Sequence, residues 1–169
     1  MSTIRRAVPQ DAAAIRTVHE QAFATTAEAN LVDQLDERGK LALSLIAERG
    51  QEIVGHIAFS PVTIEPVRME GAALGLAPLA VLPALQRQGI GAPLVTAGLE
   101  QCREAGVNWV VVLGDPNYYH RFGFRSAEQY GLSCDFDAPK EAFMAIRMQA
   151  GAPEGCAAVV RYQPEFNEV

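Results

Sequence analysis

The sequence predicts a mixed α/β fold, and two features of the chain order carry that prediction. The strand-like runs LALSLIAERG and QEIVGHIAFSPVTI are joined by a short polar connection at Arg49, Gly50 and Gln51, which is typical of an antiparallel hairpin. Further along, an apolar run, a helical segment and a second apolar run follow one another as a crossover unit. Such a unit places its two strands parallel, so the chain is expected to combine both kinds of pairing.

Length and composition predict one globular domain covering residues 1–169. A chain of 169 residues and 18.2 kDa can form a single core, because folding at this size buries roughly 70% of the unfolded surface. Hydrophobic residues at 49% and charged residues at 20% argue against disorder, collagen and a disulfide scaffold. The net charge of -6 offers no general surface for phosphates, so we expect no nucleic-acid partner.

The cysteines and the apolar segments indicate the cellular compartment in which the protein is expected. Cys102, Cys134 and Cys156 are odd in number and lack CxxC spacing, so we interpret them as free thiols in a reducing compartment, with no metal site. No apolar window of the sequence is long enough to span a bilayer. We therefore expect a cytoplasmic protein without a membrane partner.

Two helices are predicted before the hairpin. Pro9 suits the first turn of a helix whose apolar stripe includes Ile15 and Val18. A second helix is expected from about Glu28 to Arg38, with Gly39 as its C-terminal stop.

The crossover unit is predicted in the middle of the chain. Its first strand lies within residues 72–82, where Pro78 cannot donate to a ladder and so marks a bulge, an edge or a break. A helix is expected over residues 89–104, followed by a short buried strand over residues 108–113. Two further strand-like runs lie at residues 143–148 and 157–162.

The most informative segment runs from Leu76 to Leu94, where an apolar strand meets a glycine-containing turn that opens a helix. A helix N-terminus points unpaired backbone N–H groups at an anion, and Gly89 and Gly91 let ligand atoms approach the backbone, so a pyrophosphate would fit. The structural alternative is a turn that merely needs glycine. The P-loop motif is incomplete, because Ala92 and Pro93 stand where Lys and Ser or Thr are needed, and the third glycine of a dinucleotide fingerprint is missing.

The segment QRQGIGA, which follows LAVLP, resembles the acyl-CoA binding signature of the GNAT family of N-acetyltransferases. Gln86, Gly89, Gly91 and Ala92 match that signature. A second segment, PNYYHRFGF over residues 116–124, resembles the element that closes the cofactor site of the family. The finer pattern resembles a bacterial subgroup of predicted acetyltransferases, and the order of elements matches over nearly the whole chain.

The resemblance implies a fold and a cofactor site. The fold is a single domain with a mixed, mostly antiparallel central sheet that is splayed between two central parallel strands and flanked by helices. Acetyl-CoA is the implied cosubstrate, with its pantetheine arm in the opening of the sheet, bound by the backbone of Leu79, Ala80 and Val81. The residues implied around the pyrophosphate are Gln86, Arg87, Gln88, Gly89, Ile90, Gly91 and Ala92.

The resemblance also implies a general acid. Tyr119 stands four residues before Gly123 of the Gly-Phe pair, as the acid does in the family. A tyrosine with an ordinary pKa of about 10 is protonated at neutral pH, so its phenol can donate a proton to the departing thiolate. A buried aromatic with a satisfied hydroxyl is the structural alternative.

The general base has no clear candidate in the sequence. Many members of the family carry a glutamate on or beside the splayed strands, yet residues 72–82 and 109–113 contain no carboxylate. Candidates elsewhere are Glu28, Asp115, His56 and His120. We expect Asp115 to cap a helix and both histidines to be structural or solvent-facing, in which case water relays the proton.

These features predict an enzyme that transfers an acetyl group from acetyl-CoA to a primary amine by direct attack. A backbone N–H near Val81 is expected to hold the tetrahedral oxyanion. The acceptor is expected to be a small-molecule or peptide amine, and a homodimer is compatible with the resemblance. The alternatives are a non-catalytic acyl-CoA binding or sensing module and a nucleotide-binding domain.

Overall fold

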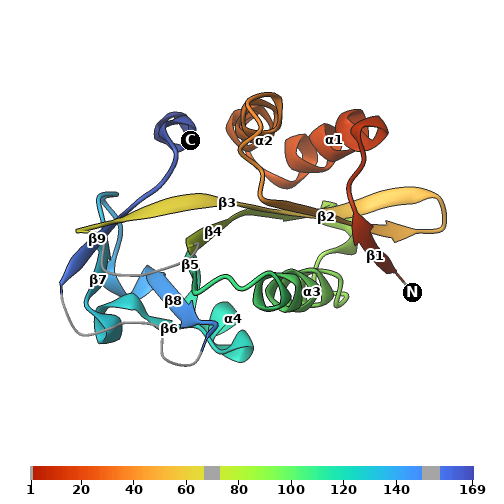
Figure 1. Cartoon of the computed structure of the whole chain (residues 1–169). Helices are drawn as coiled ribbons and strands as arrows, with labels where there is room; N and C mark the ends of the chain where they lie inside the picture. The colour runs from red at the N-terminus through yellow and green to blue at the C-terminus, as the bar shows by residue number, and fades with distance from the viewer. Residues whose placement is uncertain (1, 67–72, 150–156) are drawn as a thin grey trace. The chain divides into compact units, whose positions relative to one another are not determined.

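The computed structural model describes residues 2–66, 73–149 and 157–169 (Figure 1). The α-helices are α1 (Ala12–Ala22), α2 (Ala27–Glu37), α3 (Gly91–Glu104) and α4 (Pro116–Tyr119). The strands are β1 (Thr3–Arg6), β2 (Leu43–Arg49), β3 (Glu52–Glu65), β4 (Ala73–Val81), β5 (Trp109–Leu113), β6 (Arg125–Ser126), β7 (Leu132–Cys134), β8 (Phe143–Arg147) and β9 (Ala158–Arg161). Two compact units are formed, the first by Met1–Ser60, Ala77–Gly98 and Pro164–Val169, and the second by Pro61–Leu76 and Leu99–Gln163.

The first unit contains the antiparallel hairpin that the sequence predicts. β1 pairs with β2, and β2 pairs with β3 in a register that sets Ile46 opposite His56. Gly50 occupies the turn with a φ of 65°, a left-handed value that glycine adopts without strain. β4 follows β3 in the sheet, and just beyond its end the Leu82 N–H donates to the Val54 carbonyl at 2.9 Å.

Helices cover both faces of this first sheet. α1 and α2 lie on one face, where Ile15, Val32 and Ile46 form a buried cluster (Figure 1). The beginning of α3 lies on the other face, against the ring of Phe59. A methyl group added at Gly98 of α3 would come within 2.5 Å of the Phe59 ring, so this close packing requires glycine.

The second unit combines parallel and antiparallel pairing. β4 and β5 are parallel, with Ala73, Leu74 and Gly75 opposite Trp109, Val110 and Val111, as the crossover unit predicts. β8 pairs antiparallel with β5 and β6, and β9 pairs antiparallel with β3 and parallel with β7. The ladder between β4 and β5 covers only the first three residues of β4, which is the partial pairing expected of strands that splay.

The mixed, mostly antiparallel sheet flanked by helices is confirmed, and two details differ from the sequence prediction. α3 begins at Gly91 rather than at residue 89, because Arg87 and Gly89 have positive φ values of 63° and 79° that no right-handed helix contains. β6 and β7 were not predicted, since strands of two and three residues are too short to show an alternating pattern. Among the described residues, no helix is both long and apolar enough to cross a membrane.

Candidate active site

The turn between β4 and α3 has an unusual backbone. A short 3₁₀ turn at Pro83–Leu85 leads into Arg87 and Gly89, both in the left-handed region. Such a conformation is sparsely populated by residues other than glycine, so Arg87 is held there by the surrounding turn. A Cβ atom added at Gly89 would have nothing within 4 Å, which means that the backbone here faces open space.

Four consecutive backbone N–H groups at the end of this turn are available to a ligand. Within the described part of the chain, the N–H groups of Gly89, Ile90, Gly91 and Ala92 have no acceptor. Gly91 and Ala92 belong to the first turn of the 14-residue helix α3, whose macrodipole carries partial positive charge at this end. The arrangement can bind an anion through the backbone alone.

The two glutamine side chains of the turn bind the protein backbone. The side-chain amide of Gln86 donates to the Val81 carbonyl at 3.0 Å, and that of Gln88 donates to the Ala84 carbonyl at 3.1 Å. The structure therefore gives both residues a role in stiffening the turn. Arg87 is exposed to solvent.

Gly55 of β3 lets Ile90, just before α3, and Leu94, in its first turn, pack closely on the sheet. A Cβ atom at Gly55 would lie 3.0 Å from Leu94, 3.3 Å from Ile90 and 3.3 Å from the Ala80 carbonyl. Ile90 is 2% exposed and Ala80 is 3% exposed, so both residues are buried beside Gly55. Leu79 and Val81 are half-buried. The importance of Gly55 was missed, although a glycine inside a strand often signals a close approach.

Tyr119, the predicted acid, lies at the end of α4 in the second unit. Its ring contacts the rings of Tyr118 and Phe124 at centroid distances of 5.0 and 5.7 Å. Gly114 makes room for the ring, because a Cβ atom at Gly114 would clash with Tyr119. Burial raises the pKa of the Tyr119 phenol above the ordinary value. The group therefore holds its proton at neutral pH.

The segment before Tyr119 confirms one expectation about the acidic residues. The Asp115 carboxylate accepts from the Asn117 backbone N–H at 2.9 Å, so Asp115 is the N-cap of α4. This bond places the carboxylate in a structural role.

The two histidines considered as bases are structural or exposed, as expected. His56 is fully buried, and burial lowers its pKa to about 3, which makes it a weak base. His120 is exposed on the surface of the second unit. Glu28 is half-buried in the first turn of α2.

Burial raises the pKa of both cysteine thiols that the structure describes, Cys102 and Cys134. Cys102 is buried in α3, and burial raises its pKa to about 11, so it holds little thiolate at neutral pH. Cys134 is a free thiol, and Cys156 lies outside the described residues. No group of three or more His, Cys, Asp or Glu side chains that could hold a metal ion occurs in the described part of the chain.

Comparisons with known proteins decide which family these features represent. Residues 12–124 match the model of the acetyltransferase (GNAT) family, a span that includes both the glycine turn and Tyr119. The chain belongs to the GNAT family. The predicted acyltransferase family is thereby confirmed.

Several GNAT relatives match nearly the whole chain. The uncharacterized N-acetyltransferase YhbS of Escherichia coli K12 is 39% identical over 166 residues, which cover 97% of this chain and 98% of YhbS. The uncharacterized N-acetyltransferase YjhQ of the same organism is 38% identical, over 83% of this chain and 79% of YjhQ.

Two solved structures of GNAT proteins contain a coenzyme. The crystal structure of Escherichia coli YhbS in complex with CoA has a TM-score of 0.92 and 37% identity, covering 98% of this chain and 92% of that one. A GNAT acetyltransferase from Brucella melitensis in complex with acetyl-CoA has a TM-score of 0.81 and 38% identity, covering 98% of both chains.

Proposed function

We propose that this protein transfers an acetyl group from acetyl-CoA to the primary amine of a small molecule or peptide. The turn from Gln86 to Ala92 carries the proposal, because it combines four unengaged N–H groups, a helix N-terminus and open space at Gly89. The coenzyme found in two GNAT relatives of 37% and 38% identity supports acetyl-CoA as the cosubstrate.

Each part of the coenzyme has a proposed binding element. The pyrophosphate binds the backbone N–H groups around Gly89, and the glutamine amides of the turn keep that backbone in place. The pantetheine arm pairs with the backbone of Leu79, Ala80 and Val81. The reacting carbonyl lies where a backbone N–H near Val81 can stabilise the oxyanion.

The proposed reaction is a direct attack. The neutral amine, having released a proton to water, adds its lone pair to the thioester carbonyl and forms the C–N bond. The C–S bond then breaks, and the phenol of Tyr119 gives its proton to the thiolate. The second proton of the amine passes through water and restores the phenol. A phenol with a raised pKa suits this role, because it is fully protonated before the reaction.

A Gly89→Trp variant tests the cofactor site. The indole would fill the open space at the turn, so we expect the affinity for acetyl-CoA and CoA to fall by at least about tenfold in calorimetric titration. Gly106→Trp is the matched control, because Gly106 has the same φ of 79° and the same open surroundings at the other end of α3. Equal losses in both variants, or wild-type preference for ATP or NAD over CoA, would reject the site.

A Tyr119→Phe variant tests the acid. Removing the hydroxyl should lower kcat by roughly a hundredfold or more, while the dissociation constant for CoA stays unchanged. Tyr118→Phe is the control, since Tyr118 is the adjacent phenol. The Arg121 guanidinium carbon lies 4.7 Å from the centroid of the Tyr118 ring, and the variant keeps that ring. An unchanged kcat in Tyr119→Phe would remove this residue from the mechanism.

The second candidate function is an acyl-CoA binding or sensing module. It is favoured by one observation, the lack of any carboxylate in β4 and β5 that could act as a base. Tight CoA binding by the wild type without acetylation of any amine in a broad panel would establish this function instead.

A further inference from the structure

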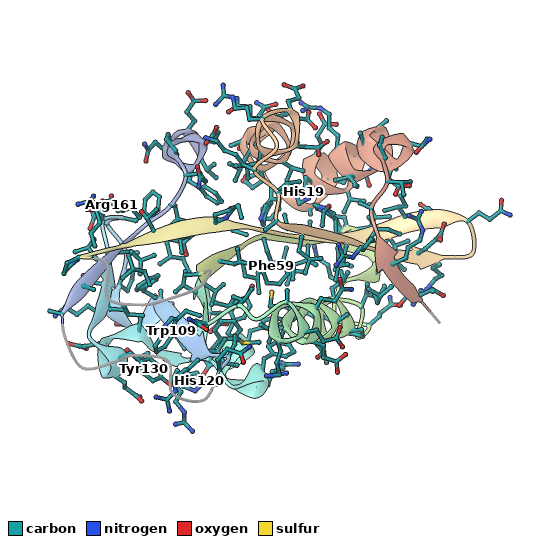
Figure 2. All side chains as sticks on the ribbon, viewed as in Figure 1. His19, Phe59, Trp109, His120, Tyr130 and Arg161 are labelled. Carbon is teal, nitrogen blue, oxygen red and sulfur yellow. The ribbon has the colours of Figure 1, made fainter. Side chains whose placement is uncertain are left out.

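A chain of hydrogen bonds runs through the interior of the first unit, on the face that α1 and α2 cover. His19 of α1 and His56 of β3 are both fully buried, and Nε2 of His19 lies 2.8 Å from Nδ1 of His56. Nε2 of His56 lies 2.8 Å from Oγ of Ser44 on β2. Figure 2 shows His19 on this face and Phe59 on the opposite one.

The direction in which the hydrogen bonds of this chain donate follows from His19, at its inner end. Nδ1 of His19 is buried and has no hydrogen-bond partner. A buried N–H without a partner is rarer and costlier than a buried lone pair without one, so the proton of His19 belongs on Nε2. His19 then donates to His56, and His56 donates from its own Nε2 to Ser44.

The outer end of the chain is therefore a serine hydroxyl that must donate. Its oxygen accepts from His56, and no described residue accepts its proton. Burial lowers the pKa of both histidines, to about 4 for His19 and about 3 for His56, so both are neutral and the direction holds at physiological pH. Such a hydroxyl is a prepared donor for an anionic or carbonyl oxygen.

Ser44 lines a cavity of about 260 Å³ that no step of the proposed acetyl transfer uses. Ile15 and Val32 give the cavity an apolar wall. Asp33 also lines it but is bound to Arg16 at 2.6 Å. Arg6 and Asp36 line the cavity as well, and within the described residues neither charge forms an ion pair.

These groups match one class of ligand. Arg6 and the donating hydroxyl of Ser44 suit a carboxylate, Asp36 suits an ammonium group, and the apolar wall suits a short hydrocarbon side chain. A ligand that carries both a carboxylate and an ammonium group and fits a cavity of about 260 Å³ is a small zwitterion. We propose that the cavity binds a free α-amino acid with a small aliphatic side chain, with its carboxylate on Ser44 and Arg6 and its ammonium group on Asp36.

Calorimetric titration of the full chain with L-leucine, without acetyl-CoA, tests the site. We expect L-leucine to bind, and 3-methylbutylamine and 4-methylpentanoate, which lack its carboxylate and its ammonium group, to bind at least about tenfold more weakly. No heat from L-leucine, or equal affinity for either fragment, would overturn the proposal. Because no acetyl transfer is measured, the result is independent of the proposed function.

Two variants and one control locate the binding. Ser44→Ala and Asp36→Asn should each weaken L-leucine binding by roughly tenfold or more. Glu37→Gln removes the same charge at the next position of α2, outside the cavity lining, and should leave the affinity unchanged. Full affinity in both Ser44→Ala and Asp36→Asn, or an equal loss in Glu37→Gln, would overturn the site. Asp36 is exposed, so its variant is expected to fold even if Ser44→Ala does not.

The direction of the hydrogen-bond chain can be measured separately. Nitrogen-15 NMR of the histidine rings should show the Nε2–H tautomer for both His19 and His56. Nδ1–H tautomers would reverse the chain, so that the Ser44 hydroxyl donates its proton to Nε2 of His56 and has none left for a ligand, which contradicts the proposed contact with a carboxylate.

Discussion

Burial acts in opposite directions on the ionisable residues of this GNAT protein. It raises the pKa of Tyr119 and keeps the phenol protonated, whereas it lowers the pKa of His19 and His56 and keeps both imidazoles neutral. In each case the neutral form is favoured, because charge is costly away from water. One physical cause therefore keeps a phenol protonated in the second unit and two imidazoles neutral in the first.

The buried histidines make stability dependent on pH. Their pKa values are lower in the folded state than the ordinary 6.5, so the unfolded state binds more protons below pH 6.5. The free energy of unfolding should be highest above pH 6.5 and fall as the pH drops toward about 4. From pH 7 to pH 5 we expect a loss of roughly 2 kcal/mol per histidine in urea unfolding.

The histidine prediction has a matched pair of variants. His19→Asn removes one buried imidazole and should reduce the difference in stability between pH 7 and pH 5. His120→Gln removes an exposed imidazole and should leave the difference as in the wild type. Equal wild-type stability at pH 5 and pH 7 would contradict the assignment of both buried rings as neutral.

At the scale of elements, small residues decide how α3 meets the sheet. Gly55 admits Ile90 and Leu94, and Gly98 admits the ring of Phe59. These contacts bring the helix close to the strands and set the position of its N-terminus. The glycine turn leads directly into this firmly packed helix. Packing of the helix therefore limits the movement of the backbone N–H groups in the turn, as a backbone anion site requires.

Gly98→Ala tests this packing. Alanine favours a helix by about 1 kcal/mol over glycine, yet its methyl group would lie 2.5 Å from the Phe59 ring. We expect net destabilisation of roughly 1–3 kcal/mol in urea unfolding. In a Phe59→Leu background the same substitution should cost less, because the ring is gone. Strictly additive effects of the two substitutions on the free energy of unfolding would show that the contact between the added methyl group and the Phe59 ring does not cause the destabilisation.

At the scale of the whole molecule, residues far apart in the chain build each unit. The Glu165 carboxylate binds the guanidinium of Arg38 at 2.6 Å and the ammonium group of Lys40 at 2.9 Å. These bonds hold the last turn of the chain beside α2 within the first unit. The two cations also lower the pKa of Glu165 to about 2, so the carboxylate stays charged in mildly acidic solution.

Much of the fold could be predicted because its signals are local. Apolar spacing and Gly39 predicted α2 to within a residue, and the polar connection at Gly50 predicted the hairpin of β2 and β3. β6 and β7 could not be predicted, since strands this short are formed by pairing with β8 and β9. The start of α3 was misplaced because Gly89 takes a left-handed φ of 79° in the turn before the helix, and no right-handed helix contains that value.

The features of the candidate site likewise fall into those that local sequence predicts and those that only the folded structure shows. The sequence alone determined the family motifs at Gly89 and Tyr119 and the cap at Asp115, because motifs and caps depend on neighbours along the chain. Only the tertiary structure decided that Ser44, His56 and His19 form one chain of hydrogen bonds. These roles depend on burial and on contacts between distant residues, and neither quantity is defined until the chain has folded.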